Sequence, residues 1–95
     1  MTDLPEIHGL CPNRFGAVKD VFVANFLAAP EGLDELAARF SLCIGGETVI
    51  DLWAGHADTA RTTPYTDQSL TPVFSTGKAV MSLLIATAVE RGLLD

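Results

Sequence analysis

The sequence predicts an α+β fold in which helices flank an antiparallel sheet. Two observations predict it: a pair of strand-like runs around a glycine turn, and a helical pattern of apolar residues on each side of that pair. The predicted order along the chain is therefore helix, hairpin, long loop and second helix. We expect the first helix to cover one face of the sheet.

The first helix is predicted over about 14–29, where apolar residues recur at three- and four-residue spacing. Residues 1–13 are expected to be irregular, because Pro5, Gly9 and Pro12 interrupt any pattern. The apolar positions of the helix are Phe15, Val18, Phe22, Val23, Phe26 and Leu27. We expect this stripe to pack on the sheet rather than to bind a ligand.

A β-hairpin is predicted over about 37–53. Runs of Ile, Val, Leu, Phe and Trp at 37–44 and 48–53 flank Gly45-Gly46-Glu47, a typical hairpin turn sequence. Cys43 lies in the first run, so we expect it to pack in the core as a small apolar side chain.

A polar, turn-rich loop follows over 54–72, and ordered loops of this length tend to carry function. His56 lies at the start of this loop. No partner carboxylate can be placed beside it, so we expect a surface or supporting histidine rather than a catalytic base. Asp51 and Asp58 are expected to pair with Arg61 and brace the loop.

The last helix is predicted over about 75–91, and its segment 79–89 is apolar around the whole circumference. Such a helix is predicted to be buried on all sides, and it is shorter than the roughly 20 apolar residues that a membrane span needs. Gly92 is expected to end it. One small domain cannot easily surround this helix, so we expect the chain to be the amino-terminal part of a larger protein.

Composition excludes several function classes. The 95 residues carry a net charge of −6, with six scattered basic residues, which argues against nucleic acid and against an anionic membrane surface as partners. Residues 1–6 hold neither a basic region nor an apolar run, so a cytoplasmic protein is expected. The two cysteines show no metal-ligand spacing, so we expect no metal and no cofactor.

Ser75 and Lys78 form the strongest chemical signal, because residues three apart on a helix share a face. A lysine amine held neutral by burial can accept the serine proton, and the first-turn N–H groups can stabilise an oxyanion. The alternative is that Ser75 only caps the helix and Lys78 is solvated. A cation is mildly unfavourable at a helix N-terminus, yet the pair alone leaves both interpretations open.

Two segments taken together are a more specific family signal than the Ser75 and Lys78 pair alone. The segments are Val49-Ile50-Asp51-Leu52-Trp53-Ala54-Gly55 and then Val73-Phe74-Ser75-Thr76-Gly77-Lys78. They resemble the serine β-lactamase and penicillin-binding-protein superfamily, and most of all its class C-like (family VIII) carboxylesterases. The resemblance covers about 9–95. It implies a β-lactamase/transpeptidase-like fold, Ser75 as nucleophile and Lys78 as its base. The family's catalytic tyrosine has an asparagine two residues on, whereas Tyr65 precedes Ser75 and has Asp67 there, so the role is not assigned to Tyr65.

The resemblance implies a serine hydrolase that acts on carboxylic esters through an acyl-enzyme. Its expected partners are a small-molecule ester or amide substrate and the remainder of the same protein. Because the family's other catalytic residues cannot be assigned here, the isolated chain 1–95 is expected to be inactive without the carboxy-terminal part. The alternatives are a β-lactamase or D-amino-acid peptidase, and a non-catalytic penicillin-binding-like module.

Overall fold

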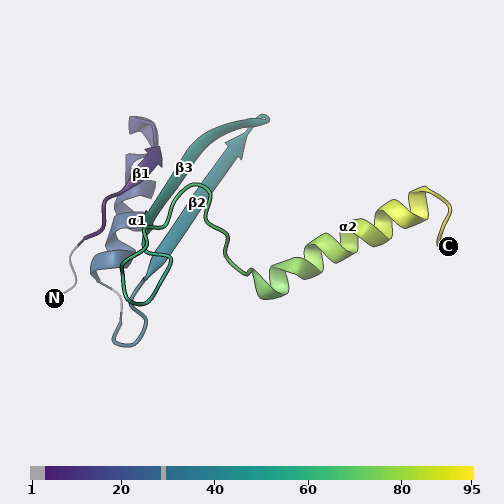
Figure 1. Cartoon of the computed structure of the whole chain (residues 1–95). Helices are drawn as coiled ribbons and strands as arrows, with labels where there is room; N and C mark the ends of the chain where they lie inside the picture. The colour runs from purple at the N-terminus through teal and green to yellow at the C-terminus, as the bar shows by residue number, and fades with distance from the viewer. Residues whose placement is uncertain (1–3, 29) are drawn as a thin grey trace.

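The computed structural model, which describes residues 4–28 and 30–95, contains an antiparallel sheet with one helix against it and a second helix standing apart (Figure 1). The sheet has three strands in the order β1-β3-β2. These observations confirm the α+β class with an antiparallel sheet. The elements are β1 (His8–Leu10), a 3₁₀ turn η1 (Asn13–Phe15), α1 (Gly16–Leu27), β2 (Ala37–Ile44), β3 (Glu47–Gly55), a second 3₁₀ turn η2 (Phe74–Thr76) and α2 (Gly77–Glu90).

A two-residue turn joins β2 to β3. Gly45 and Gly46 have φ angles of 60° and 81°. Positive φ at both central residues is what a type I′ turn requires, and its twist matches that of the flanking strands. The register runs from Ile44 opposite Glu47 at the turn to Ala37 opposite Gly55 at the far end.

The core lies between α1 and one face of β3. Alternation along the strand places Ile50, Leu52 and Ala54 on that face, where they are at most 1% exposed. Phe22 and Phe26 reach them from α1, and their rings meet edge to face with centroids 5.6 Å apart. The aromatic stripe of α1 therefore packs on the sheet. Residue 29, the last residue of the helix expected from the sequence, lies outside the described residues.

Cys43 is exposed, so the prediction that it packs in the core is wrong. Leu42 pairs with Ile50 on the helix-facing side, and the register shifts between Leu42 and Cys43. Cys43 thus lies near the hairpin end, away from α1, where its Sγ is 3.4 Å from Thr48 Oγ1. An apolar run in the sequence does not say which residue of a strand faces the core.

The strand β1 falls in a region that was expected to be irregular, and this expectation is wrong for residues 8–10. Gly9 pairs with Leu52 of β3, and its φ is +107°. A Cβ at this position would collide with the carbonyl oxygen of Asp51, so the close pairing requires glycine. Three residues centred on glycine give no alternation that a sequence pattern could reveal. Residues 1–3 of the same region lie outside the described residues.

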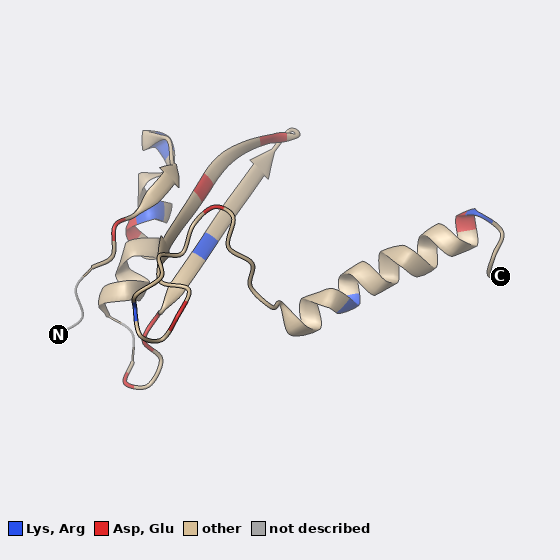
Figure 2. Cartoon of the chain, in the orientation of Figure 1, with Lys and Arg blue, Asp and Glu red and all other residues tan. Residues whose placement is uncertain are grey.

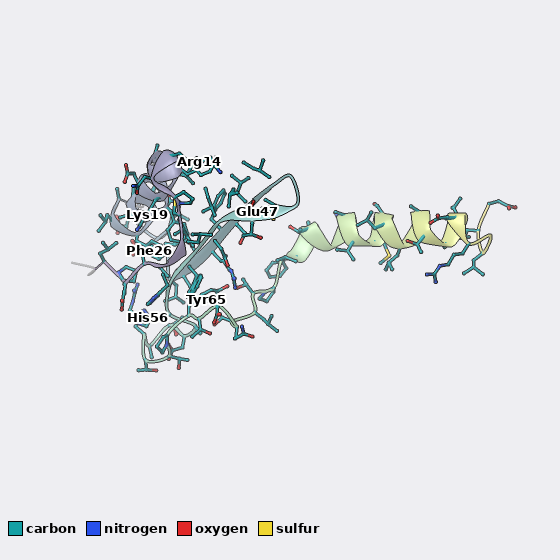
Figure 3. All side chains as sticks on the ribbon, turned by 90° about the horizontal axis from the view of Figure 1, so that it is seen from above. Arg14, Lys19, Phe26, Glu47, His56 and Tyr65 are labelled. Atoms are coloured by element: carbon teal, nitrogen blue, oxygen red, sulfur yellow. The ribbon has the colours of Figure 1, made fainter. Side chains whose placement is uncertain are left out.

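The helix α2 extends away from the sheet, and its side chains stand clear of the other elements (Figures 1 and 3). No residue of α2 is buried. Its large apolar side chains are 48–68% exposed: Val80, Met81, Leu83, Leu84, Ile85 and Val89. The burial predicted for α2 is therefore not met within the described residues. Both α1 and the loop before α2 pack on the sheet, so neither of them covers this helix. Burial stays a prediction for a longer protein.

The end of α2 matches the sequence prediction. Leu93 N–H donates to the Ala88 carbonyl at 2.9 Å, and Gly92 N–H donates to the Val89 carbonyl at 3.0 Å. This pair of bonds is the Schellman motif, in which glycine follows the helix. Gly92 is thus confirmed as the helix-ending glycine.

Charged residues are sparse on α2 and lie only near its ends, at Lys78 and Glu90 (Figure 2). Across residues 4–28 and 30–95, no helix is both long enough and apolar enough to cross a membrane.

Replacing Phe22 by alanine is expected to destabilise the complete protein by about 3–5 kcal/mol, because the change leaves a cavity between α1 and β3. Urea unfolding measures the loss. Lys19→Ala is the matched control, since Lys19 lies on the same helix and is exposed. Equal stability of the two variants would contradict the core described above.

Candidate active site

The segment that leads to Ser75 starts at the end of β3 and is anchored there by backbone hydrogen bonds. His56 N–H donates to the Leu36 carbonyl and Tyr65 N–H donates to the Gly55 carbonyl, both at 2.9 Å. Figure 3, seen from above, shows Lys19 and Phe26 of α1 on one side of the sheet and His56 and Tyr65 on the other. The loop 56–73 therefore packs on the side of the sheet opposite α1.

Asp58 organises the first part of this loop. Its Oδ1 accepts hydrogen bonds from the N–H groups of Thr62 and Thr63, both at 2.9 Å, and its Oδ2 accepts one from the Thr62 hydroxyl. These bonds hold the pKa of the Asp58 carboxyl below its usual value, and the Thr62 hydroxyl contributes most. The predicted pairing with the Arg61 side chain is wrong, because local donors already satisfy the carboxylate.

Asp51 also pairs with a different residue from the one expected. Its carboxylate accepts two hydrogen bonds from Arg39, Nε to Oδ1 at 3.0 Å and Nη2 to Oδ2 at 2.8 Å. Ser41 Oγ donates a third, at 2.8 Å. The Arg39 bond, followed by the Ser41 bond, lowers the pKa of Asp51. Arg61 is therefore not its partner, because strand register brings Arg39 and Ser41 to this face.

Arg39 also contacts the loop. Its Nη1 donates to the Asp67 carbonyl oxygen at 2.7 Å, and its guanidinium lies 5.3 Å from the centre of the Trp53 ring. Neither Arg39 nor Ser41 was expected from the sequence to take part in the site. The available signal was their alternation with apolar residues on β2, which places both on the same face as Asp51.

Ser75 lies in η2, and Lys78 lies in the first turn of α2. Both are exposed. In the described part of the chain no hydrogen bond joins Ser75 Oγ to Lys78 Nζ, and no side-chain hydrogen bond caps η2 or α2. The two residues are one turn apart, as their spacing predicts, but their side chains are not hydrogen-bonded to each other.

The backbone immediately before Ser75 is strained. Phe74 has a φ of +43°, in the left-handed region that residues other than glycine rarely adopt. Such a conformation costs about 1–3 kcal/mol and is found most often at functional sites. The N–H groups of Thr76 and Gly77 bond to the carbonyls of Val73 and Phe74, so these two donors are already used inside the turn. No residue pattern around Phe74 indicates this strained conformation in advance.

His56 and Tyr65 lie outside the Ser75 turn. His56 is partly buried and forms a β-bridge with Pro64, and its buried Nδ1 has no hydrogen-bond partner among residues 4–28 and 30–95. The Tyr65 hydroxyl is 3.3 Å from Thr71 Oγ1. Among the described residues, no group of three or more His, Cys, Asp and Glu side chains could hold a metal ion.

Comparison with known proteins identifies the family. Residues 27–95 match the family model named Beta-lactamase, which is well over half of the chain. The chain belongs to the beta-lactamase family. Over 90 residues it is 32% identical to the esterase/beta-lactamase LipL of Mycobacterium tuberculosis, covering 95% of this chain and 20% of that protein.

Two solved structures are similar to this beta-lactamase-family chain. A novel penicillin-binding protein homologue from Caulobacter crescentus is 48% identical, with a TM-score of 0.80 over 92% of this chain and 22% of the other. A family VIII carboxylesterase is 38% identical, with a TM-score of 0.82 over 95% and 23%. The chain thus spans about a fifth of the length of these relatives. Relatives named as esterase and beta-lactamase support a serine hydrolase family.

Loss of the Arg39 hydrogen bonds is expected to make the protein more sensitive to acid. The pKa of Asp51 in the folded state lies below the ordinary value of 3.8, so its contribution to stability is present above that pH and is lost as pH falls through the lowered pKa. Arg39→Gln should therefore unfold at a higher pH, which circular dichroism during acid titration measures. Lys19→Gln removes the same charge from α1 and serves as control. Identical acid midpoints for both variants would contradict this assignment.

Proposed function

We propose that the complete protein is a serine hydrolase that acts on carboxylic esters through an acyl-enzyme, with Ser75 as nucleophile and Lys78 as base. One observation carries the proposal: Ser75 and Lys78 lie one turn apart at a strained helix start, within the segment that matches the beta-lactamase family. An activated serine needs a fixed position and a base that can come within hydrogen-bond reach, and a lysine one turn away on the same helix face has the spacing for that.

In the proposed reaction, Ser75 Oγ bonds to the ester carbonyl carbon while its proton moves to Lys78 Nζ. The Ser75 N–H donates to the oxyanion that forms. The carbon–alkoxide bond then breaks, and the alcohol leaves with the proton that Lys78 accepted. Water attacks the acyl-enzyme in the second step, which releases the carboxylic acid and restores the Ser75 hydroxyl.

The proposal depends on the part of the protein that follows residue 95. Lys78 is exposed among the described residues. A lysine accepts a proton only if burial or a neighbouring group lowers its pKa. We propose that the carboxy-terminal part covers the apolar surface of α2, desolvates Lys78 and supplies the tyrosine that assists it. The isolated chain 1–95 should accordingly be inactive.

Esters are the proposed substrates because two of the relatives are named as an esterase and a carboxylesterase. The first alternative is a β-lactamase or D-amino-acid peptidase, which the names beta-lactamase and penicillin-binding protein homologue favour. The second alternative is a non-catalytic penicillin-binding-like module in which Ser75 caps the helix. The lack of a side-chain cap bond from Ser75 in the described residues argues against that role.

Ser75→Ala is expected to abolish hydrolysis of a short-chain p-nitrophenyl ester by the complete protein, because the acyl-enzyme cannot form. Intact mass after treatment with a fluorophosphonate probe should show an adduct on the parent protein and none on the variant. Ser82→Ala, on the same helix, is the control, and it should still hydrolyse the ester and form the adduct with the probe. Near-normal hydrolysis by Ser75→Ala would refute the catalytic assignment, and turnover of a chromogenic cephalosporin in place of esters would favour the β-lactamase alternative.

Lys78→Met is expected to lower kcat for the same ester by at least about 100-fold, the usual scale for a positioned proton acceptor. Methionine keeps the unbranched side chain but cannot accept a proton. Steady-state kinetics of the complete protein measures the effect, with Lys19→Met as control. A loss of less than tenfold would show that another group is the base.

A further inference from the structure

The turn 66–69 precedes the Ser75 segment and is closed by its own hydrogen bonds. Ser69 N–H donates to the Thr66 carbonyl at 3.1 Å, and Thr66 N–H donates back to Ser69 Oγ at 2.9 Å. Gln68 N–H donates to Thr66 Oγ1 at 3.2 Å. The turn therefore forms a small unit whose Asp67 carbonyl accepts its hydrogen bond from outside, from Arg39.

Arg39 joins this turn to the sheet. Three of its nitrogens donate hydrogen bonds, two to the Asp51 carboxylate on β3 and one to the Asp67 carbonyl. The carboxylate holds the guanidinium in a forked geometry that lysine cannot reproduce. The side chains of Arg39 and Asp51 are 32% and 25% exposed, so water screens the pair only in part. Within the described ranges, no other side-chain hydrogen bond links β2 or β3 to residues 66–69.

The anchored turn sets where the catalytic segment begins. Ser75 follows Asp67 by eight residues, and the Tyr65 hydroxyl lies near Thr71 Oγ1, which holds the intervening chain beside the turn. The segment then passes through the strained Phe74. A strained conformation persists only when its surroundings hold it in place. The chain that leads into Phe74 therefore has to be fixed on the sheet.

We propose that Arg39 is a positioning residue for Ser75: held by Asp51, it fixes the 66–69 turn on the sheet and thereby fixes the segment that presents the nucleophile. This inference rests on the proposed function. It concerns the rate at which Ser75 is acylated and not the binding of substrate, because the hydrogen bonds of Arg39 in the described residues go to Asp51 and to the 66–69 turn.

The test measures how fast a fluorophosphonate probe labels Ser75 in the complete protein, expressed per folded molecule. Misplacement of a reacting group by about 1 Å costs about 100-fold, so Arg39→Ala should slow labelling by about 10- to 100-fold. Free guanidinium ion, far below denaturing concentrations, should restore part of the rate by binding between Asp51 and the Asp67 carbonyl. The same concentration of sodium chloride should not.

Arg14→Ala is the matched control, because the Arg14 guanidinium also lies over an aromatic ring, 4.8 Å from the centre of Phe15, but on the side of α1. The fluorophosphonate probe should label Ser75 of Arg14→Ala at the parent rate. Arg39→Lys keeps the charge and the aliphatic stem, which preserves folding if Arg39→Ala does not fold. Lysine cannot donate two parallel hydrogen bonds to the Asp51 carboxylate and a third to the Asp67 carbonyl. Labelling of Arg39→Lys is therefore expected to be about tenfold slower than that of the parent.

Labelling of Arg39→Ala and Arg39→Lys at the parent rate per folded molecule would overturn the inference. So would a loss of rate in Arg39→Ala that guanidinium and sodium chloride affect equally, since that indicates a general structural loss. Ser75→Ala separates the two proposals. If Ser75→Ala is still labelled by the probe, the assignment of Ser75 as nucleophile fails. If Ser75→Ala is not labelled and the Arg39 variants are labelled at the parent rate, that assignment stands and the positioning role of Arg39 fails.

Discussion

The two faces of β3 organise the whole structure, because this strand is the only one of the three that pairs with both others. One face carries Ile50 and Leu52, which are buried in the core together with Phe22 and Phe26 of α1. The opposite face carries Asp51 and Trp53, and there the sheet meets the loop that leads to Ser75. Since side chains alternate strictly along a strand, a single register sets both faces at once.

This arrangement places the apolar core and the proposed Ser75 site on opposite sides of the sheet. The apolar contacts that hold the sheet and α1 together lie on one side, away from the Ser75 segment. The other side is held by polar contacts, in which a guanidinium, a carboxylate and a backbone carbonyl meet at 2.7–3.0 Å. Polar contacts of this kind are directional, so they can set the position of a loop more narrowly than apolar packing does.

The helix α2 has no buried residue and exposes its large apolar side chains. An apolar surface as continuous as that of α2 is unfavourable in water, and surfaces of this kind mark contacts with other parts of a protein. The chain covers about a fifth of the length of its relatives. In the complete protein as we propose it, further sequence covers α2, and the same covering shields Lys78 from water.

Local features could be predicted from the sequence. The Gly45-Gly46 turn, the aromatic stripe that ends in Phe22 and Phe26, and the helix-ending Gly92 each depend on residues within one or two turns of chain. The spacing of Ser75 and Lys78 is equally local. Family membership followed because two such local segments occur in a fixed order, and the match over residues 27–95 bears it out.

Tertiary structure alone decided the contacts between distant residues. Arg39 and Asp51 are twelve positions apart and Arg39 and Asp67 twenty-eight, and from the sequence we expected Arg61, not Arg39, to pair with Asp51. The pairing of β1, the exposure of Cys43 and the strain at Phe74 were hidden for the same reason. A residue pattern describes the chain near itself, whereas strand register and loop closure depend on which distant backbone groups meet, and that is settled only when the whole chain folds.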